Sequence, residues 1–261
     1  MIKMSKALRT HILNSLDKGM RLDGRKADEI RDIKIEFDVT KNAEGSAKVT
    51  WGETEVIAGV KMGLESPYPD SPEDGNLMVN AELLPLSNPE FETGPPGIQA
   101  IEMARVIDRG IRESKSIDTK KLCLKAGEKV WSVMVDILPI NDAGNLLDVG
   151  SVAAIAAIKN AKFPEVSKDF EVDYKTKSKT GIPMKQEPIE VTVYKIGEHL
   201  IVDPTIDEMK VYDARLTVAY IANGDIVAMQ KAGEEAITID VIGKMVELAH
   251  TTSEKIRAKL G

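Results

Sequence analysis

The chain has 261 residues, of which 43% are apolar and 4% aromatic, and its 35 basic and 42 acidic side chains give a formal net charge of −7. This composition is sufficient for a sizeable core, and it excludes a disordered chain, a collagen-like chain and a disulfide scaffold. The single cysteine, Cys123, cannot form an internal disulfide, and no apolar run approaches the roughly 20 residues that span a bilayer. We therefore expect a cytoplasmic protein that does not contact membranes. The negative charge argues against a wholly basic nucleic-acid coat but leaves room for a local basic patch.

The first part of the chain is predicted to be a short helix followed by strands that frame two further helices. Residues 5–16 read as a helix because Leu8, Ile12 and Leu16 recur at four-residue spacing. The helix predicted at 144–161 is apolar on most sides, so it is expected to be deeply buried. Residues 162–188 contain six lysines and are predicted to be a solvated polar connector. The predicted strands are 33–39, 47–51, 55–62, 76–84 and 130–138, and the predicted helices are 98–114 and 144–161.

The second part of the chain returns to strands and ends in a helix. Asn223-Gly224 is a strong hairpin signal between two of these strands. The predicted strands are 189–194, 199–202, 216–222 and 225–230, and the last helix lies within 234–260. This order predicts an α+β fold with two related halves, near 30–165 and 188–255. We expect residues 1–20 to form an N-terminal helical extension and residues 21–261 to form a single domain.

Familiar catalytic and cofactor motifs are missing from the sequence. It contains no glycine-rich phosphate loop, no dinucleotide-binding fingerprint and no serine-nucleophile elbow. The three histidines, His11, His199 and His250, are far apart in the sequence and lack metal-ligand spacing. The residues alone therefore point to no cofactor and no metal site.

The clearest functional signal lies in the helix predicted at 98–114. At about 100° per residue, its apolar side chains fall on one face, and Arg105, Arg109 and Arg112 fall on the opposite face. Three guanidinium groups in a row match the spacing of a phosphate backbone. The alternative is an ordinary solvated face, in which Glu102, Asp108 and Glu113 pair with these arginines.

Four segments together resemble the RNase PH superfamily. Residues 21–25 resemble its Arg-x-Asp-Gly-Arg signature, and residues 51–58 resemble its Gly-Asp/Asn-Thr-x-Val strand. Residues 141–146 fall where the family begins its buried phosphate-site helix, and residues 203–205 begin the segment that carries metal-binding acids. The matches span about 20–260, and their order and spacing are specific. The resemblance implies an RNase PH-like fold.

Within the superfamily, the chain is most similar to the non-catalytic RNase PH-type subunits of archaeal exosomes. The resemblance implies a hetero-hexameric ring of three heterodimers, in which this subunit pairs with a catalytic RNase PH-type subunit, under RNA-binding cap subunits. Such rings shorten single-stranded RNA from its 3′ end by phosphorolysis. The resemblance also implies that Arg105 and Arg109, with Arg112 on the same face, contact RNA phosphates beside the partner's active site.

Departures from the family pattern predict that this chain has no catalytic residue, metal site or cofactor of its own. Active members carry Gly-Gly-Thr-Arg where this chain has Ala143 to Leu146, so the phosphate-binding arginine is replaced by Leu146. Of two family aspartates six residues apart, Asp203 is kept and the other is Met209. A further family aspartate aligns with Arg215.

Two alternatives remain at this stage. The first is an active phosphate-dependent 3′-to-5′ exoribonuclease with a rearranged acidic site around Asp203, Asp207 and Glu208, with Asp213 nearby. The second is a pure assembly protein whose arginines make only surface ion pairs.

Overall fold

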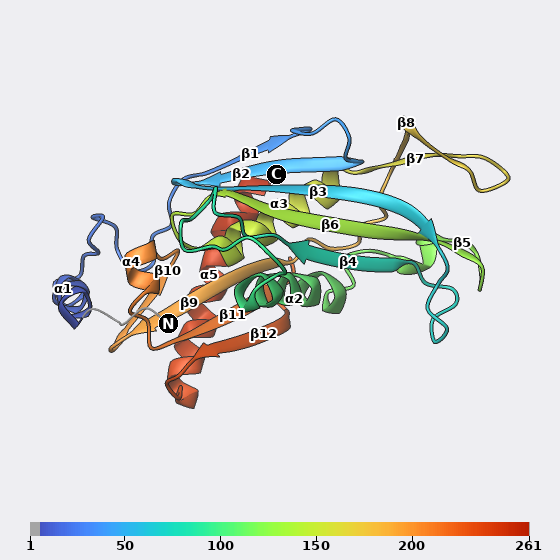
Figure 1. The fold of residues 1–261 in the computed structure, drawn as a ribbon. Coiled ribbons are helices and arrows are strands. Elements are labelled where there is room, and N and C mark those ends of the chain that lie inside the picture. Colours follow the sequence, from blue (N-terminus) through green and yellow to red (C-terminus); the bar gives the residue numbers. More distant parts are fainter. Residues whose placement is uncertain (1–5, 261) are drawn as a thin grey trace.

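The computed structural model describes residues 6–260, and these form the α+β arrangement that the sequence predicts (Figure 1). The larger sheet follows the order β1-β2-β3-β6-β4, with β5 paired to β6. Its pairs are antiparallel except that of β4 with β6, which is parallel. The strands are β1 (Ile33–Phe37), β2 (Gly45–Trp51), β3 (Thr54–Glu65), β4 (Asn76–Ala81), β5 (Cys123–Lys125) and β6 (Lys129–Asn141).

The second sheet is antiparallel and has the order β10-β9-β11-β12. Its strands are β9 (Ile189–Ile196), β10 (His199–Val202), β11 (Ala214–Tyr220) and β12 (Ile226–Gly233). The long C-terminal helix, α5 (Ile239–Leu260), packs against β9 and β11. A short helix, α4 (Ile206–Met209), follows β10 and begins with a capping box between Thr205 and Glu208. The sequence pattern missed α4 because a four-residue helix has no readable periodicity.

The helix α3 (Leu146–Asn160) lies between the two sheets, where it contacts β2, β3 and β6 on one side and β9 on the other (Figure 1). Its side chains from Leu147 to Ile158 are buried, which confirms the predicted deep burial. One hydrophobic cluster joins α3 to buried side chains of both sheets. The helix α2 (Ile98–Glu113) lies beside this core and contacts β4 of one sheet and β12 of the other.

The N-terminal helix α1 (Lys6–Leu16) docks on the second half of the chain. Its buried residues Ile12 and Leu16 join a separate apolar cluster with Tyr194, Ile196 and Ile201. An ion pair of 2.8 Å between Arg9 of α1 and Asp213, just before β11, adds a polar contact between this helix and the second half of the chain. Residues 1–5 of the predicted extension lie outside the described residues.

The prediction of a solvated connector at 162–188 is wrong for most of its length. Residues Lys162–Val166 form β7 and residues Val172–Gly181 form β8, which pair as an antiparallel hairpin that extends from the body of the molecule (Figure 1). Most side chains of β8 are exposed on both faces, and Val172 and Tyr174 are its only apolar residues, so the alternation of apolar and polar residues is too short to indicate a strand. The Nζ of Lys177 donates to the carbonyl oxygen of Ala43 at 2.8 Å and so connects the hairpin to the loop before β2.

A short 3₁₀ helix, η1 (Thr119–Leu122), connects α2 to β5. None of the helices within residues 6–260 combines the length and apolar character needed to cross a bilayer.

Candidate nucleic-acid interface and the adjoining pocket

The helix α2 begins where a proline-rich segment ends, at Gly97, whose backbone is extended. The apolar residues of α2 recur at every third or fourth position, so they gather on one face of the helix. The buried residues of its inner face are Ala100, Met103, Val106, Ile107, Gly110 and Ile111. The outer face carries Arg105, Arg109 and Arg112, all exposed, which is the arrangement that the sequence predicts.

The three arginines differ in how far neighbouring groups occupy them. The Arg112 guanidinium pairs with Asp108 at 2.7 Å and donates to the Leu77 carbonyl at 3.1 Å, and the contact with Asp108 raises the pKa of Arg112. The Nη1 of Arg109 donates to the neutral side chain of Gln230 on β12 at 3.1 Å. Arg105 makes no hydrogen bond or ion pair within the described part of the chain.

The alternative, in which Glu102 pairs with an arginine of α2, does not hold for this residue. Its carboxylate pairs instead with Arg215 of β11, with 2.7 Å between Oε2 and Nη2. The Arg215 side chain is 13% exposed and lies beside Tyr194 and Tyr212, whose rings meet edge to face at 5.3 Å. The expectation for Asp108 is confirmed through Arg112. The Glu102–Arg215 pair could not be predicted from helical spacing, because the two residues are 113 positions apart in the sequence.

A cavity of about 390 Å³ opens between the two halves of the fold, beside the N-terminal end of α2. Its lining brings together Leu146, Met209 and Arg215, the three positions at which the sequence departs from active members of the resembled family. Gln99, Glu102 and Met103 of α2 line it as well. The altered pocket therefore adjoins the helix that carries the three arginines, although none of the three lines the pocket.

The first turn of α3, at the edge of this pocket, is closed by a methionine. Asn145 is fully buried in a left-handed conformation (φ 63°), and its backbone N–H donates to Sδ of Met209 at 3.2 Å. The preceding Gly144 also has a positive φ of 96°, and a Cβ there would overlap the carbonyl oxygen of Pro204. The helix terminus that can bind an anion in other proteins thus faces a neutral thioether.

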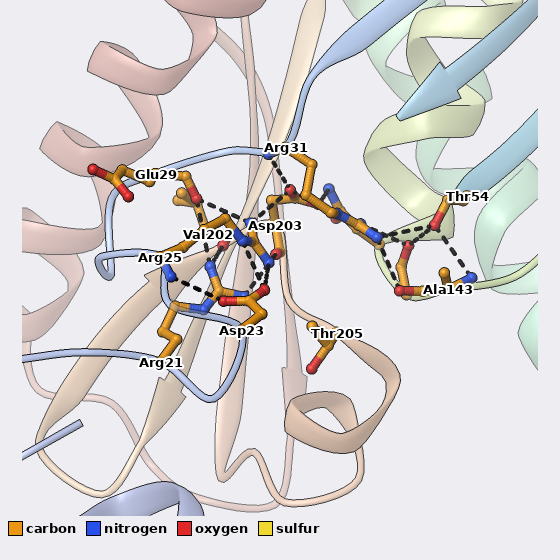
Figure 2. A network of polar contacts seen from close by, with 12 residues as sticks. Arg21, Asp23, Arg25, Glu29, Arg31, Thr54, Ala143, Val202, Asp203 and Thr205 are labelled. Carbon is orange, nitrogen blue, oxygen red and sulfur yellow. Dashed lines mark hydrogen bonds and ion pairs between the residues drawn. The ribbon is translucent and has the colours of Figure 1, made fainter. Parts of the chain in front are cut away.

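The carboxylate of Asp203 is held by Arg25 and Arg31 of the segment before β1 (Figure 2) and by Asn145 at the start of α3. It accepts hydrogen bonds from Nη1 of Arg25 at 2.8 Å, from the backbone N–H of Arg31 at 2.8 Å and from Nδ2 of Asn145 at 3.1 Å. The guanidinium of Arg31 also contacts Asp203 and reaches the carbonyl oxygens of Ala143 and Gly144, so it links this acid to the loop before α3. Asp203 is 1% exposed and both its oxygens are occupied.

The other acids considered for a rearranged site do not gather around Asp203. Glu208 is buried and pairs with the buried Arg21, whose Nε lies 2.8 Å from Oε1. Asp207 is exposed, and Asp213 pairs with Arg9. Within residues 6–260, no three histidine, cysteine, aspartate or glutamate side chains lie close enough to hold a metal ion together. Asp203 and Glu208 thus serve as partners of arginines in the Arg-Leu-Asp-Gly-Arg segment and just after it.

Two buried acids behind α2 escaped the sequence analysis. Burial raises the pKa of Asp148 to about 7, although the backbone N–H and the hydroxyl of Thr192 donate to its carboxylate at 3.1 and 2.6 Å. Burial, with the nearby charge of Asp148, also raises the pKa of Glu190 well above its usual value. Glu190 fits against Gly110 of α2, where a Cβ would overlap its Oε1. The only sequence signal was an acid within each apolar segment.

Comparison with known proteins identifies the family. Residues 29–164 match domain 1 of the 3′ exoribonuclease family, and residues 186–252 match its domain 2. The exosome complex component Rrp42 of Sulfurisphaera tokodaii is 43% identical over 251 residues, which make up 95% of this chain and 91% of that protein. The protein of the same name from Archaeoglobus fulgidus is also 43% identical, with 96% of this chain and 95% of that protein covered.

Solved structures give the same result. A chain of the Archaeoglobus fulgidus exosome with RNA bound to the active site has a TM-score of 0.91 and 42% identity, with 98% of each chain covered. Rice Rrp46, at 17% identity and a TM-score of 0.69, shares the fold. These matches confirm the RNase PH-like fold that the motifs predict. The chain is therefore a member of the 3′ exoribonuclease, or RNase PH, family and is similar to the RNase PH-type subunits of archaeal exosomes.

Proposed function

We propose that this chain is a non-catalytic subunit of an archaeal-type exosome ring. It pairs with a catalytic RNase PH-type subunit, helps to form that partner's active site, and binds RNA phosphates during 3′-to-5′ phosphorolytic degradation. The observation that carries this proposal is the exposed row of Arg105, Arg109 and Arg112 beside a pocket that has lost the family's phosphate-binding groups.

The loss of catalysis follows from the chemistry of that pocket. Phosphorolysis needs positively charged or N–H groups that bind inorganic phosphate, and acids that hold a metal or assist the leaving group. Here Leu146 offers no charge, and Met209 covers the backbone N–H of Asn145. The two cations that line the pocket, Lys210 and Arg215, are paired with Glu90 and Glu102. Each missing electrostatic donor lowers a rate by roughly 10²–10³.

The rearranged acidic site is the weaker candidate. Asp203 is enclosed by Arg25 and Arg31, and Glu208 is paired with Arg21. Asp207 is exposed, and neither of the other two acids is available to act with it. Both oxygens of Asp203 accept hydrogen bonds from guanidinium groups, so neither is directed toward a metal ion or a substrate. The contacts favour a structural role for Asp203.

RNA binding by the arginine row is expected to be independent of sequence. Guanidinium groups match phosphate oxygens, and contacts to phosphate position an RNA without reading its bases. Aromatic residues make up only 4% of the chain, so base stacking is not its main means of holding RNA. Arg105 and Arg109 are the stronger candidates, because Arg112 is already neutralised by Asp108.

The relatives supply the expected partners. The similar proteins are named exosome complex components, and one similar chain comes from an exosome with RNA at its active site. We propose a hetero-hexameric ring of three heterodimers, RNA-binding cap subunits above it, and a cytoplasmic location in keeping with the single unpaired cysteine. The assignment of residues 21–261 to one domain also stays a proposal.

Charge reversal in the assembled ring tests this function. Arg105→Glu with Arg109→Glu should weaken the binding of a labelled 20-nucleotide RNA in phosphate-free buffer and flatten its salt dependence by about 0.7 to 1 unit per lost phosphate contact. Lys168→Glu with Lys175→Glu, on the exposed hairpin, makes the same change of charge away from α2. A pure assembly protein would give the wild-type affinity and slope with both pairs of substitutions.

A further inference from the structure

Both acids that stand one helical turn from Arg105 are held by other cations. In an α-helix, side chains three positions apart are neighbours at about 5–6 Å, so Glu102 and Asp108 are the natural ion-pair partners of Arg105. Glu102 pairs with Arg215 across the pocket, and both oxygens of Asp108 contact Arg112. Arg105 is left exposed and without an ion pair or hydrogen bond within residues 6–260.

The anchor that holds Glu102 is well buried. The Arg215 side chain is 13% exposed, whereas Glu102 is 33% exposed and sits on a helix face that also carries Arg105 and Arg109. Helical geometry places Glu102 about 60° from Arg105 and about 20° from Arg109 around the helix axis. A buried guanidinium requires a counter-charge, so the pair with Arg215 is favoured over an exposed pair between Glu102 and Arg105.

The position of Arg215 makes this arrangement specific to the altered pocket. It lines the cavity together with Leu146 and Met209, where the family resemblance places an acid. A carboxylate at position 215 would repel Glu102 and leave it to pair with Arg105. The change of charge in the pocket and the availability of the arginine on α2 are therefore physically linked.

We propose that Arg215 is a positioning residue for RNA binding: it holds Glu102 away from Arg105, so that the Arg105 guanidinium stays free for an RNA phosphate. Arg112 does the same for Asp108 from the other side. This inference rests on the proposed RNA contact of α2, and it assigns the former catalytic pocket a present role in setting the charge of that helix.

The test measures RNA affinity of the assembled ring in phosphate-free buffer, with a labelled 20-nucleotide single-stranded RNA at several salt concentrations. Arg215→Gln releases Glu102, so it should reduce affinity about fivefold at 0.1 M salt and lower the salt slope by about 0.7, as expected for one phosphate contact. Glu102→Gln combined with Arg215→Gln should restore the wild-type affinity and slope. Glu113→Gln, on the same helix, is the control for removing one negative charge.

Two further variants identify the target of the released carboxylate. Arg105→Gln should weaken binding as much as Arg215→Gln does, and the two together should weaken it no further. If the variant with both Glu102→Gln and Arg215→Gln binds as weakly as Arg215→Gln alone, Arg215 acts through packing and the inference is overturned. The same holds if Arg215→Gln binds like the wild type while Arg105→Gln does not.

A separate outcome would remove the proposed function itself. If Arg105→Gln and Arg109→Gln both leave affinity and salt slope unchanged, α2 does not contact RNA, and the role of Arg215 falls with it. The thermal unfolding and the mass of each assembled variant ring are compared with those of the wild type, so that a loss of fold or assembly is detected separately. Should Arg215→Gln alone fail to assemble, the comparison of wild type, Glu102→Gln and the variant with both substitutions still decides, since the inference predicts equal salt slopes for all three.

Discussion

The backbone N–H of Asn145 donates its hydrogen bond to the thioether sulfur of Met209, 3.2 Å away. Sulfur is a weak acceptor and carries no charge, so the terminus of α3 is covered without an anion. The family resemblance places inorganic phosphate at this terminus and an aspartate at position 209. One residue thus removes an acid and closes the site that the acid would serve.

Asp203 is expected to matter for stability. Asp203→Asn retains the shape and tolerates the positive φ of 48° at this position, but it leaves Arg25 and Arg31 without their shared counter-charge. Breaking a buried ion pair in this way should reduce the free energy of unfolding by about 3 kcal/mol, measured by urea denaturation. Asp207→Asn, at an exposed position, should change it by less than about 0.5 kcal/mol. Equal effects of the two substitutions would contradict this role.

Gly110 lets α2 approach the buried acid Glu190. A Cβ at this position would overlap Oε1 of Glu190, which is 1% exposed and has little room to move. Gly110→Ala should therefore destabilise the fold by about 1 kcal/mol, even after the helix-propensity gain of alanine. Gly243→Ala in α5 has nothing within 4 Å of the new Cβ and should stabilise by up to about 1 kcal/mol. Thermal unfolding of both variants gives the comparison, and a stabilising Gly110→Ala would show that the packing is looser than described.

Asp148 should make stability depend on pH. Its pKa is about 7 in the folded state and near the model-peptide value of 3.8 when unfolded, because burial disfavours its charged form. The unfolded chain therefore loses this proton first, and stability falls as the pH rises from about 4 to 7, by at most about 1.4 kcal/mol per pH unit. Above pH 7 the contribution stops changing.

Asp148→Asn removes this titration while keeping an acceptor for Thr192. The difference in unfolding free energy between wild type and Asp148→Asn, measured by urea denaturation from pH 4.5 to 8, should shift in favour of the variant up to about pH 7 and then level off. Both proteins are compared in a Glu190→Gln background, because the charge of Asp148 also raises the pKa of Glu190. A difference that stays constant across this range would mean that Asp148 is ionised throughout.

Much of the fold could be predicted from the sequence because most of its elements are buried on one face or, like α3 and β9, throughout. The predicted bounds of the helices α2, α3 and α5, and of every strand of the two sheets except β5, lie within a few residues of the observed ones. These elements show the pattern of apolar residues that burial imposes. The hairpin of β7 and β8 escaped prediction because neither of its faces is buried over most of its length. Backbone pairing alone leaves no pattern in the side chains.

The site was predictable only in part, for a related reason. Helical spacing was enough to align Arg105, Arg109 and Arg112 on one exposed face. It could not reveal that Glu102 reaches across to Arg215, or that Arg25 and Arg31 converge on Asp203, because these pairs depend on how distant segments pack. Spacing along the chain gives the candidate partners of a charge, and tertiary structure selects among them.

The most direct measurement of the central claim is phosphate-dependent shortening of single-stranded RNA by the isolated full chain, followed as release of nucleoside diphosphates. The isolated chain should release none, with or without 10 mM phosphate and Mg²⁺, and release should appear once a catalytic RNase PH-type subunit is added. Phosphate-dependent release by the isolated chain, retained through successive purification steps, would contradict the account.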